Sequence, residues 1–219
     1  MANERHRRIM ALLHQHTSLS VSQLAHLLGV SEVTIRKDLT LLEQQQMLYR
    51  VHGSAILANP YIQDRHVNDK EKLYSDEKRA IGAYAARLVE PRDTILIGSG
   101  TTTLAMAREI RGAEELTAIT TSLSVASVLA ENDECTVIQL GGVLRSSSFS
   151  VVGPFAEQML RQFSCSKLFF GVDGFDLTYG VTTTNLMGGH LALMMIETVQ
   201  KVVALVDSSK FGRRGFCKM

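Results

Sequence analysis

The spacing of hydrophobic residues predicts three helices in the N-terminal part of the chain. Residues 3–14 carry apolar side chains at helical intervals among arginines, which is the pattern of an amphipathic helix. A second, short helix begins after Ser20 and ends at Gly29, because serine caps helix starts and glycine tolerates the left-handed conformation of a helix end. Ser31 caps a third helix. The predicted buried stripe of this third helix consists of Ile35, Leu39 and Leu42.

Two short extended runs follow in the segment MLYRVHGSAIL, residues 47–57, on either side of His52-Gly53-Ser54. Extended runs around a small turn predict a β-hairpin. Three helices followed by a hairpin are typical of a winged helix-turn-helix, and we assign this fold to residues 1–57.

The polar side of the third helix is a candidate DNA-reading surface. A helix-turn-helix protein inserts the start of its recognition helix into the major groove, where side chains reach phosphates and base edges. The expected contacts come from Ser31, Val33, Thr34, Arg36 and Lys37 on this helix and from Arg50 and His52 in the hairpin. The alternative is a solvated surface that binds nothing, because most polar helix faces are of that kind.

Hydrophobic runs alternate with helical segments in the rest of the chain. Residues 58–74 are polar and show no early apolar period, so we expect a linker there. A helix is predicted from about Ser75 to just before Pro91, and its apolar positions are Ile81, Tyr84, Ala85 and Leu88. The strands predicted after it are 94–98, 116–120, 135–142, 167–174 and 201–207. This alternation implies an α/β domain over residues 75–219, with a mostly parallel sheet covered by helices.

Four of the predicted strands end in turns of small residues with hydroxyl groups, and the turn GSGTTT at residues 98–103 is the most informative. Its glycines let a ligand approach the backbone, and the helix that starts near Thr103 directs free N–H groups and a positive dipole end toward an anion. The turn lacks the Lys of a Walker P-loop and does not match G-x-G-x-x-G, which favours a phosphate monoester over a nucleotide. A purely structural glycine turn is the alternative.

Further polar groups follow the other strands. Arg145 and Lys210 are suited to neutralise a phosphate, while Asp173 and Asn185 are suited to hydrogen-bond sugar hydroxyls. Because ligands of open α/β sheets bind at the carboxyl ends of the strands, we expect these groups to converge on one crevice. Each of them alone is more often an ordinary surface residue.

Composition and charge narrow the function classes only slightly. The chain has 219 residues, of which 45% are hydrophobic and 21% charged, as in ordinary globular proteins. No apolar run approaches the ~20 residues that span a bilayer, and the charged N-terminus is unlike a signal peptide, so we expect a cytoplasmic protein with no membrane partner. Residues 1–60 hold six Lys and Arg against four Asp and Glu, a mild basic excess that suits nucleic acid without requiring it.

The cysteines give no sign of redox or metal chemistry. Cys135, Cys165 and Cys217 lie far apart and form no C-x-x-C pair, so neither a disulfide framework nor a zinc site is expected. We assign no metal and no cofactor.

The motifs VSEVTIRKDLTLLE and LYRVHGSA, followed by GSGTTT, GGVLR, FFGVDGFD, GVTTTN and DSSKFG, resemble those of the DeoR family of bacterial transcriptional regulators over nearly the whole chain. The resemblance implies a winged helix followed by a sensor domain similar to ribose-5-phosphate isomerase and glucosamine-6-phosphate deaminase. It also implies a repressor of a sugar or sugar-alcohol operon, not an enzyme. The closest-looking subgroup is that of the glucitol and N-acetylgalactosamine operon repressors.

The resemblance further implies the partners and the site. The partners are double-stranded operator DNA and a phosphorylated sugar or sugar-alcohol effector, and assembly as a homodimer or homotetramer is expected. Matched motif by motif, the implied effector contacts are Ser99, Gly100, Thr101, Thr102, Thr121, Gly142, Arg145, Asp173, Thr184 and Lys210.

Three departures from the family pattern affect these expectations. Gln46 and Ser54 stand where the family usually has glycine, which predicts a differently shaped wing. LMGGH follows Asn185 where the family usually has acidic residues, so we expect an acidic effector contact or a helix cap to be lost there. The family commonly continues some tens of residues beyond DSSKFG, and one interpretation of the end at Met219 is a C-terminal truncation that exposes a sheet edge.

Two other functions remain open. A sugar-phosphate isomerase with an attached DNA-binding segment would need a carboxylate base near neutral pKa, and Asp173 is a candidate. A degenerate regulator would bind DNA but would have lost its effector.

Overall fold

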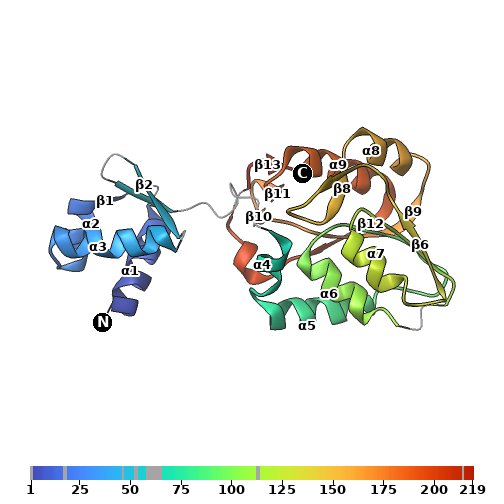
Figure 1. Ribbon diagram of the computed structural model, residues 1–219, viewed down its shortest axis with the longest axis horizontal. Helices are drawn as coiled ribbons and strands as arrows, with labels where there is room; N and C mark the ends of the chain where they lie inside the picture. The colour runs from blue at the N-terminus through green and yellow to red at the C-terminus, as the bar shows by residue number, and fades with distance from the viewer. Residues whose placement is uncertain are drawn as a thin grey trace. The chain divides into compact units, whose positions relative to one another are not determined.

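The computed structural model describes residues 2–16, 19–45, 47–51, 54–57, 66–111, 114–213 and 215–219. The chain divides into two compact units, Met1–Pro60 and Tyr61–Met219 (Figure 1). Each unit has a hydrophobic core of its own. The predicted boundaries at residues 57 and 75 remain predictions.

The N-terminal unit contains three helices and a small antiparallel sheet. Its elements are α1 (Ala2–Gln15), β1 (Leu19–Ser20), α2 (Val21–Leu28), α3 (Glu32–Gln44), β2 (Leu48–Val51) and β3 (Ser54–Leu57). β1 and β2 both pair with β3. The predicted hairpin is therefore present, and it gains a third strand that is only two residues long and leaves no periodic signal in the sequence.

The predicted ends of α2 and the predicted start of α3 are confirmed. Ser20 Oγ accepts a hydrogen bond from the Gln23 N–H at 3.1 Å, and Gln23 Oε1 accepts one from the Ser20 N–H at 2.8 Å. This reciprocal capping box satisfies two backbone donors at the start of α2. Gly29 ends α2 in the left-handed conformation, with φ 67°. Ser31 Oγ accepts from the Thr34 N–H and starts α3.

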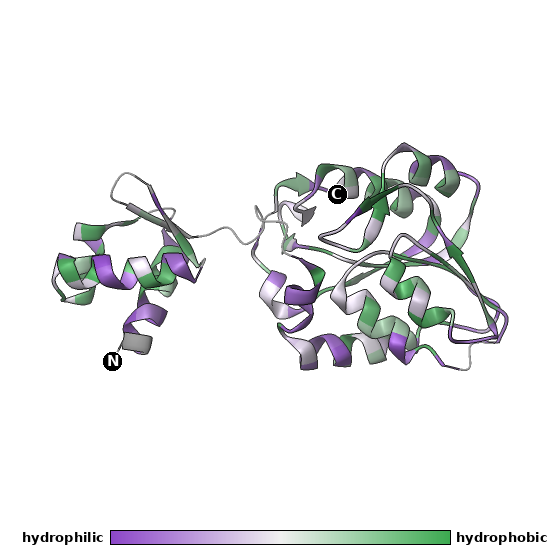
Figure 2. Cartoon of the chain, in the orientation of Figure 1, coloured by the Kyte–Doolittle hydropathy of each residue, from purple (hydrophilic) through white to green (hydrophobic). Residues whose placement is uncertain are grey.

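The predicted stripe of α3 faces the core of this unit. Ile35, Leu39 and Leu42 are at most 1% exposed, and they pack with Ile9 of α1 and Leu24 of α2. Each such side chain contributes about 1.5–3 kcal/mol by leaving water. Figure 2 shows hydrophobic and hydrophilic stretches alternating along α3, as expected of a helix with one buried side. Burial thus fixes which side of α3 remains free to meet a ligand.

A buried carboxylate also holds α3 against α1. Asp38 is 4% exposed and accepts two hydrogen bonds from the Arg5 guanidinium, while His6 Nε2 lies 3.0 Å from its Oδ1. The Arg5 hydrogen bonds hold the pKa of the Asp38 carboxyl below its usual value, against the opposing effect of burial. The polar side of α3 is therefore fixed in rotation by an ion pair as well as by apolar packing.

The C-terminal unit is a three-layer α/β domain. Its helices are α4 (Val67–Glu71), α5 (Ser75–Ala86), α6 (Thr101–Glu109), α7 (Leu123–Leu129), α8 (Pro154–Leu160), α9 (Leu186–Glu197) and the 3-10 helix η1 (Ser208–Lys210). Its strands are β4 (Thr94–Ile97), β5 (Leu116–Thr120), β6 (Cys135–Gln139), β7 (Val143–Arg145), β8 (Ser150–Val152), β9 (Cys165–Gly171), β10 (Gly174–Asp176), β11 (Gly180–Thr183), β12 (Val199–Leu205) and β13 (Cys217–Lys218).

Five strands form the expected parallel sheet, in the order β12-β9-β4-β5-β6. Side chains alternate between its two faces. Ile95 and Ile97 share a core with residues of α5, α6 and α7, whereas Leu96 shares a core with residues of α8 and α9. The two groups of helices lie on different sides of the sheet (Figure 1). Two smaller sheets, β7-β8 and β10-β11-β13, lie outside this central sheet.

Three local expectations differ from the structure. The run predicted as one strand over 167–174 breaks after Gly171, and β10 begins separately at Gly174. The helix predicted to run through Leu88 ends at Ala86, and its Tyr84 is 67% exposed, so this residue is not on the buried side. The segment predicted as a linker contains α4, which five mostly polar residues form without an apolar period. Within the described ranges, no helix has the length and apolar character to span a membrane.

Candidate functional site

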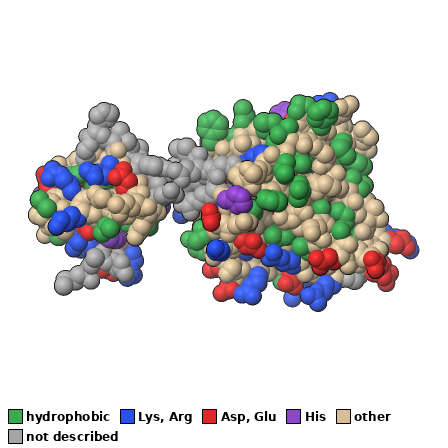
Figure 3. Space-filling model, in the orientation of Figure 1, with side chains coloured by type: hydrophobic (Ala, Val, Ile, Leu, Met, Phe, Trp, Pro, Cys, Tyr) green, Lys and Arg blue, Asp and Glu red, His purple; other side chains and the backbone are tan. Residues whose placement is uncertain are grey.

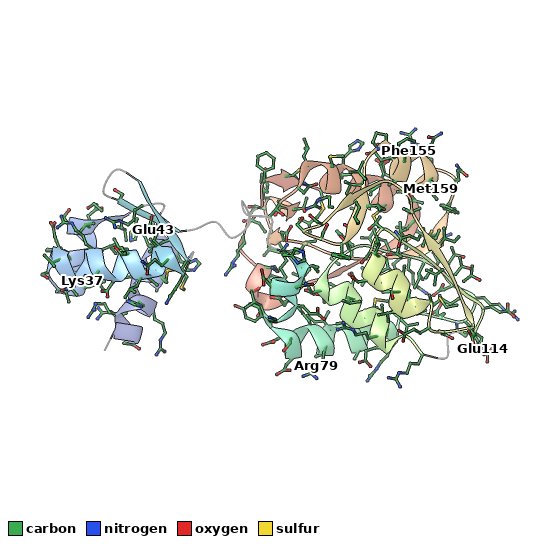
Figure 4. The ribbon with its side chains drawn as sticks, in the orientation of Figure 1. Lys37, Glu43, Arg79, Glu114, Phe155 and Met159 are labelled. Carbon is green, nitrogen blue, oxygen red and sulfur yellow. The ribbon has the colours of Figure 1, made fainter. Side chains whose placement is uncertain are left out.

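The start of α3 presents the predicted DNA-reading residues. Val33 is 59% exposed, and Lys37 is exposed farther along the helix (Figure 4). The Ser31 and Thr34 hydroxyls lie 2.9 Å apart and bond to each other, so part of their hydrogen-bonding capacity is used in the helix cap. In the space-filling view, Lys and Arg side chains are visible over α3 (Figure 3). The structure thus exposes a mixed apolar and basic strip at the helix start.

Arg36 is not an independent cation on this strip. Its Nη2 donates to Glu32 Oε2 at 2.6 Å across one helical turn, and both side chains are about half exposed. Glu32 was not predicted as a site residue, because an acidic residue in the first turn of a helix is explained by the helix dipole alone. In a major groove, however, an Arg suits guanine and a Glu suits the amino group of cytosine.

The hairpin contributes Arg50, which lies beside α3. Arg50 Nη1 donates to Thr40 Oγ1 at 3.2 Å, and the Arg50 N–H donates to Glu43 Oε1 at 3.1 Å. These contacts place a second guanidinium next to the recognition helix. The predicted contact His52 and the departure at Gln46 lie outside the described residues.

In the C-terminal unit, the predicted ligand groups lie at the point where the strand order reverses. β4 is the first strand of the sheet; β5 and β6 follow on one side of it, and β9 and β12 on the other. Open α/β sheets bind ligands at such a switch point, beyond the carboxyl ends of the strands. The GSGTTT turn follows β4, and Asp173 follows β9. These two predicted groups are therefore neighbours at the centre of the sheet.

The GSGTTT turn opens directly into α6. Gly100 is the N-cap residue, with φ 141° and no side chain to bond the first turn. The first N–H groups of a helix lack partners within the helix, so they are available to an anion. Ser99, Gly100 and Thr101 are partly exposed, while Thr102 is only 7% exposed. Thr103 Oγ1 donates back to the Gly100 carbonyl at 2.9 Å and braces the turn.

Asp173 accepts hydrogen bonds with both of its carboxylate oxygens. Its Oδ2 accepts from the Thr184 N–H at 3.0 Å and from the hydroxyls of Thr183 and Thr184, each at 3.1 Å. Its Oδ1 accepts from Lys70 Nζ at 3.1 Å. Burial by itself would raise the pKa of the Asp173 carboxyl, but Lys70, the Thr184 N–H and Lys210 outweigh burial and keep this pKa below its usual value.

Two ammonium groups act on this carboxylate, and a third lies beside them. Lys70 lies on α4 and Lys210 in η1, and both act electrostatically on Asp173. Lys78 of α5 is only 7% exposed and donates from Nζ to the Lys70 carbonyl. Burial lowers the pKa values of Lys78 and Lys210, while Asp207 opposes this for both. Lys70, Lys78 and Lys210 also interact electrostatically with one another, and such a cluster of cations suits a phosphate.

Lys70 and Lys78 were missed in the sequence. Lys78 carried a usable signal: it stands in line with the buried positions Gly82 and Ala85 of α5, where an apolar residue is expected. A lysine on a buried stripe is a candidate functional residue, because burying an ammonium group costs free energy unless it is compensated. Lys70 carried no such signal, since it lies in a short polar segment.

The remaining predicted ligand residues lie after β5, around β7 and before α9. Thr121 is 4% exposed. Gly142 has φ 150°, and a Cβ there would come within 2.7 Å of the Val152 carbonyl, so the backbone itself requires glycine at this position. Arg145 Nη1 lies close to Gly188, 3.3 Å from the position that a Cβ would occupy. This places the Arg145 guanidinium near the first turn of α9.

The expected loss of a helix cap after Asn185 is wrong. Asn185 Oδ1 accepts from the Gly188 N–H at 2.8 Å and is itself the N-cap of α9. The carboxamide supplies the acceptor that an acidic residue was expected to supply. The loss of an acidic effector contact at this place remains a prediction.

Family models match both units. Residues 5–60 match the model described as the DeoR-like helix-turn-helix domain, and residues 74–219 match the model described as the DeoR C-terminal sensor domain.

Curated relatives match nearly the whole chain. A protein of Escherichia coli O157:H7, named as a transcriptional repressor of the aga operon, is 36% identical over 220 residues, covering 99% of this chain and 81% of that protein. The transcriptional regulator GolR of Listeria innocua is 34% identical, covering 95% and 82%. The transcriptional repressor GlcR of Bacillus subtilis is 32% identical, covering 95% and 80%.

Solved structures show more distant similarity. Ribose 5 phosphate isomerase A from Neisseria gonorrhoeae has a TM-score of 0.47 and 19% identity, covering 64% of this chain and 54% of that chain. The sorbitol operon regulator SorC from Klebsiella pneumoniae has a TM-score of 0.35 and 13% identity, covering 76% and 66%.

Proposed function

The chain belongs to the DeoR family of transcriptional regulators, and from this premise we propose that it represses an operon for the use of a sugar or sugar alcohol. The operator is read by α3 and the hairpin, and a phosphorylated sugar or sugar alcohol bound to the C-terminal unit controls the binding. A regulator of this kind acts in the cytoplasm, where the chromosome is. The observation that carries the proposal is the basic and apolar strip at the start of a well-anchored α3, in a chain that also contains a sensor domain.

We assign distinct roles to the residues of this strip. Lys37 contacts a phosphate or a guanine, Arg36 reads a guanine edge, and Val33 packs on a thymine methyl group. Ser31 and Thr34 hold the helix start and bond to a backbone phosphate or a nearby base. Arg50 follows the phosphates that flank the groove.

The proposed effector site combines a phosphate subsite and a hydroxyl subsite. The α6 start with Ser99, Gly100, Thr101 and Thr102, together with Lys210, holds the phosphate. Asp173 and Thr184 bond to sugar hydroxyls, and Thr121, Gly142 and Arg145 line the side toward α9. The convergence of ammonium groups at the switch point of the sheet supports this assignment.

The proposed mechanism is a shift between two arrangements of a homodimer or homotetramer. Operator half-sites are spaced by helical turns of DNA, so two recognition helices must be held at a matching distance. The effector binds one arrangement more tightly and thereby changes the fraction of protein that fits the operator.

An isomerase activity is less well supported. A general base works best with a pKa near the working pH, whereas the surroundings of Asp173 keep its pKa below the usual range of a carboxyl. The regulators named among the relatives also favour repression. Incubation with aldose and ketose phosphates should therefore give no turnover.

Substitution of Lys37 tests the DNA-reading role of α3. Lys37→Ala should weaken operator binding roughly 5- to 150-fold, since one such contact is worth about 1–3 kcal/mol. It should also reduce the salt dependence of binding if the contact is to phosphate. Mobility-shift titrations at two salt concentrations measure both effects. Arg8 is an exposed residue of α1, so Arg8→Ala is the matched control and should have little effect on operator binding. Unchanged affinity of Lys37→Ala would refute the assignment of α3 as the recognition helix.

A further inference from the structure

α4 connects the ligand site to the segment that joins the two units. Among the described residues it is the first element of the C-terminal unit, and its Lys70 stands only ten positions after Pro60, the last residue of the N-terminal unit. We propose that the Lys70–Asp173 ion pair is a latch that ligand binding opens, so that α4 transmits occupancy of the ligand site toward the DNA-binding unit. This inference rests on the proposed function, because it needs an anionic effector at this site.

Two contacts of α4 go to segments with proposed ligand residues, and a third goes to Lys78 of α5. Lys70 Nζ lies 3.1 Å from Asp173 Oδ1, and the Lys70 carbonyl accepts from the buried Lys78. The Val67 N–H donates to the Ser147 carbonyl at 2.7 Å, and Ser147 Oγ accepts from Arg145 at 3.4 Å. Because these contacts join α4 to the ligand site, we expect α4 to move when the ligand site rearranges.

Lys70 and Asp173 form an ion pair that is partly buried. Their side chains are 29% and 18% exposed, so the pair is less screened by water than a surface ion pair. The second carboxylate oxygen of Asp173 already accepts three hydrogen bonds from Thr183 and Thr184. A ligand hydroxyl that bonds to Asp173 therefore competes with Lys70 for the first oxygen, and a ligand phosphate competes with Asp173 for the Lys70 ammonium group.

Binding of the phosphate to Lys70 and binding of a hydroxyl to Asp173 reinforce each other. When the phosphate draws Lys70 away, Asp173 keeps its threonine donors and the nearby charge of Lys210, and its Oδ1 becomes available for a hydroxyl. A ligand that carries both a phosphate and a hydroxyl therefore gains more binding free energy than the two groups would give separately. A sugar without phosphate leaves the latch closed. The ligand class that opens the latch is a phosphorylated polyol.

α4 carries a second ion pair that serves as a control. Glu71 Oε1 lies 2.8 Å from Arg108 Nη1 of α6, and these side chains are 40% and 53% exposed. This pair anchors α4 without touching Asp173. Lys72, the next residue, is an exposed lysine at the end of the same helix. The response of α4 to the ligand could require only an ion pair that anchors the helix, or only a positive charge on it. In that case substitution of Glu71 or Lys72 will have the same effect as substitution of Lys70.

The absence of tryptophan from the sequence allows a specific probe of α4. Leu73 follows α4 and is 45% exposed. The tryptophan fluorescence of a Leu73→Trp variant of the full chain therefore reports only on the surroundings of residue 73. Titration with D-glucitol 6-phosphate should change its emission in a saturable way, and D-glucitol without phosphate should not. Adding Lys70→Met should reduce the amplitude at saturation at least threefold, whereas Glu71→Gln or Lys72→Met should leave most of it.

Amide hydrogen exchange of the unmodified chain provides a second measurement that needs no variant. Saturation with D-glucitol 6-phosphate, or with inorganic phosphate if it binds, should raise exchange in residues 67–71. A ligand that raises the unfolding temperature but changes neither the emission nor this exchange overturns the latch and leaves the proposed function intact. The latch is equally overturned if Lys72→Met acts like Lys70→Met. Failure of a full panel of sugar phosphates to bind overturns the proposed effector control, and the latch with it.

Discussion

Asp38 shows how one residue on the recognition helix serves the fold instead of the ligand. It stands on the buried side of α3 with Ile35, Leu39 and Leu42, and its carboxylate bonds to Arg5 and His6 of α1. A buried ion pair that loses one partner leaves an uncompensated charge, which makes such a pair costly to break. Asp38 therefore fixes the orientation of Lys37 and Arg36 without contacting DNA.

We predict that Asp38→Asn lowers the free energy of unfolding of the N-terminal unit by about 1.5–3 kcal/mol at pH 7. The folded state lowers the pKa of Asp38, so its stabilising effect is fully present above the usual carboxyl pKa of about 3.9 and is lost as the pH falls through the lower, folded-state value. The difference in the free energy of unfolding between wild type and variant should stay constant from pH 8 to about 5 and should decrease at still lower pH. Calorimetry of the full chain over this pH range measures it.

Glu32→Gln is the matched control for this prediction. Glu32 pairs with Arg36 on the same helix but is exposed, so its loss should change stability by less than about 0.5 kcal/mol. Equal losses for both variants at pH 7 would contradict the role given to Asp38.

At the scale of elements, α5 and α6 meet more closely than ordinary side chains allow. A Cβ on Gly82 of α5 would lie 2.6 Å from the Met106 backbone nitrogen and 2.8 Å from the Ala105 carbonyl carbon. This close approach presses α5, with Lys78, against α6, whose first turn forms part of the proposed phosphate subsite. A glycine in the middle of a helix, normally unfavourable, thus has a packing reason here.

We predict that Gly82→Ala destabilises the C-terminal unit by about 1–3 kcal/mol, although alanine is the better helix former. The reason is that the atoms it meets belong to the backbone and cannot move aside. Thermal unfolding measures the effect. Gly141→Ala is the control, because its Cβ meets only the flexible Met159 Sδ at 3.4 Å, and it should cost little. A stabilised Gly82→Ala protein would show that the two helices separate easily.

At the scale of the whole molecule, the two units have separate cores. The core that includes Ile35 and Leu39 shares no residue with the two cores around the parallel sheet. Separate cores allow the units to unfold in separate steps, and a ligand stabilises only the unit to which it binds.

We predict two unfolding transitions for the full chain, of which a bound sugar phosphate raises only one. At a free ligand concentration of about 100 times its Kd, the C-terminal unit should gain about 2.7 kcal/mol. Differential scanning calorimetry with and without D-glucitol 6-phosphate, or another binding member of a sugar-phosphate panel, measures this, and the unphosphorylated polyol is the control. Equal shifts of both transitions would contradict independent units.

The sequence by itself determined most of the elements of this protein. The caps at Ser20, Gly29 and Ser31 and the stripe of Ile35, Leu39 and Leu42 depend on residues within a few positions of one another, so local rules suffice to predict them. The five strands of the parallel sheet were likewise visible as apolar runs. The strands' order and the extra strand β1 were not, because pairing depends on distant residues.

Only the tertiary structure decided which partners the predicted ligand residues have. Asp173 and Lys210 were predicted from their places after strands, but Lys70 meets Asp173 across 103 positions of sequence, and no periodicity records such a contact. The partners of Asp38 are likewise distant in the sequence, because Arg5 and His6 lie 33 and 32 positions before it. Local spacing sets secondary structure and its caps, whereas the partners of a charge are set by which surfaces hydrophobic burial brings together.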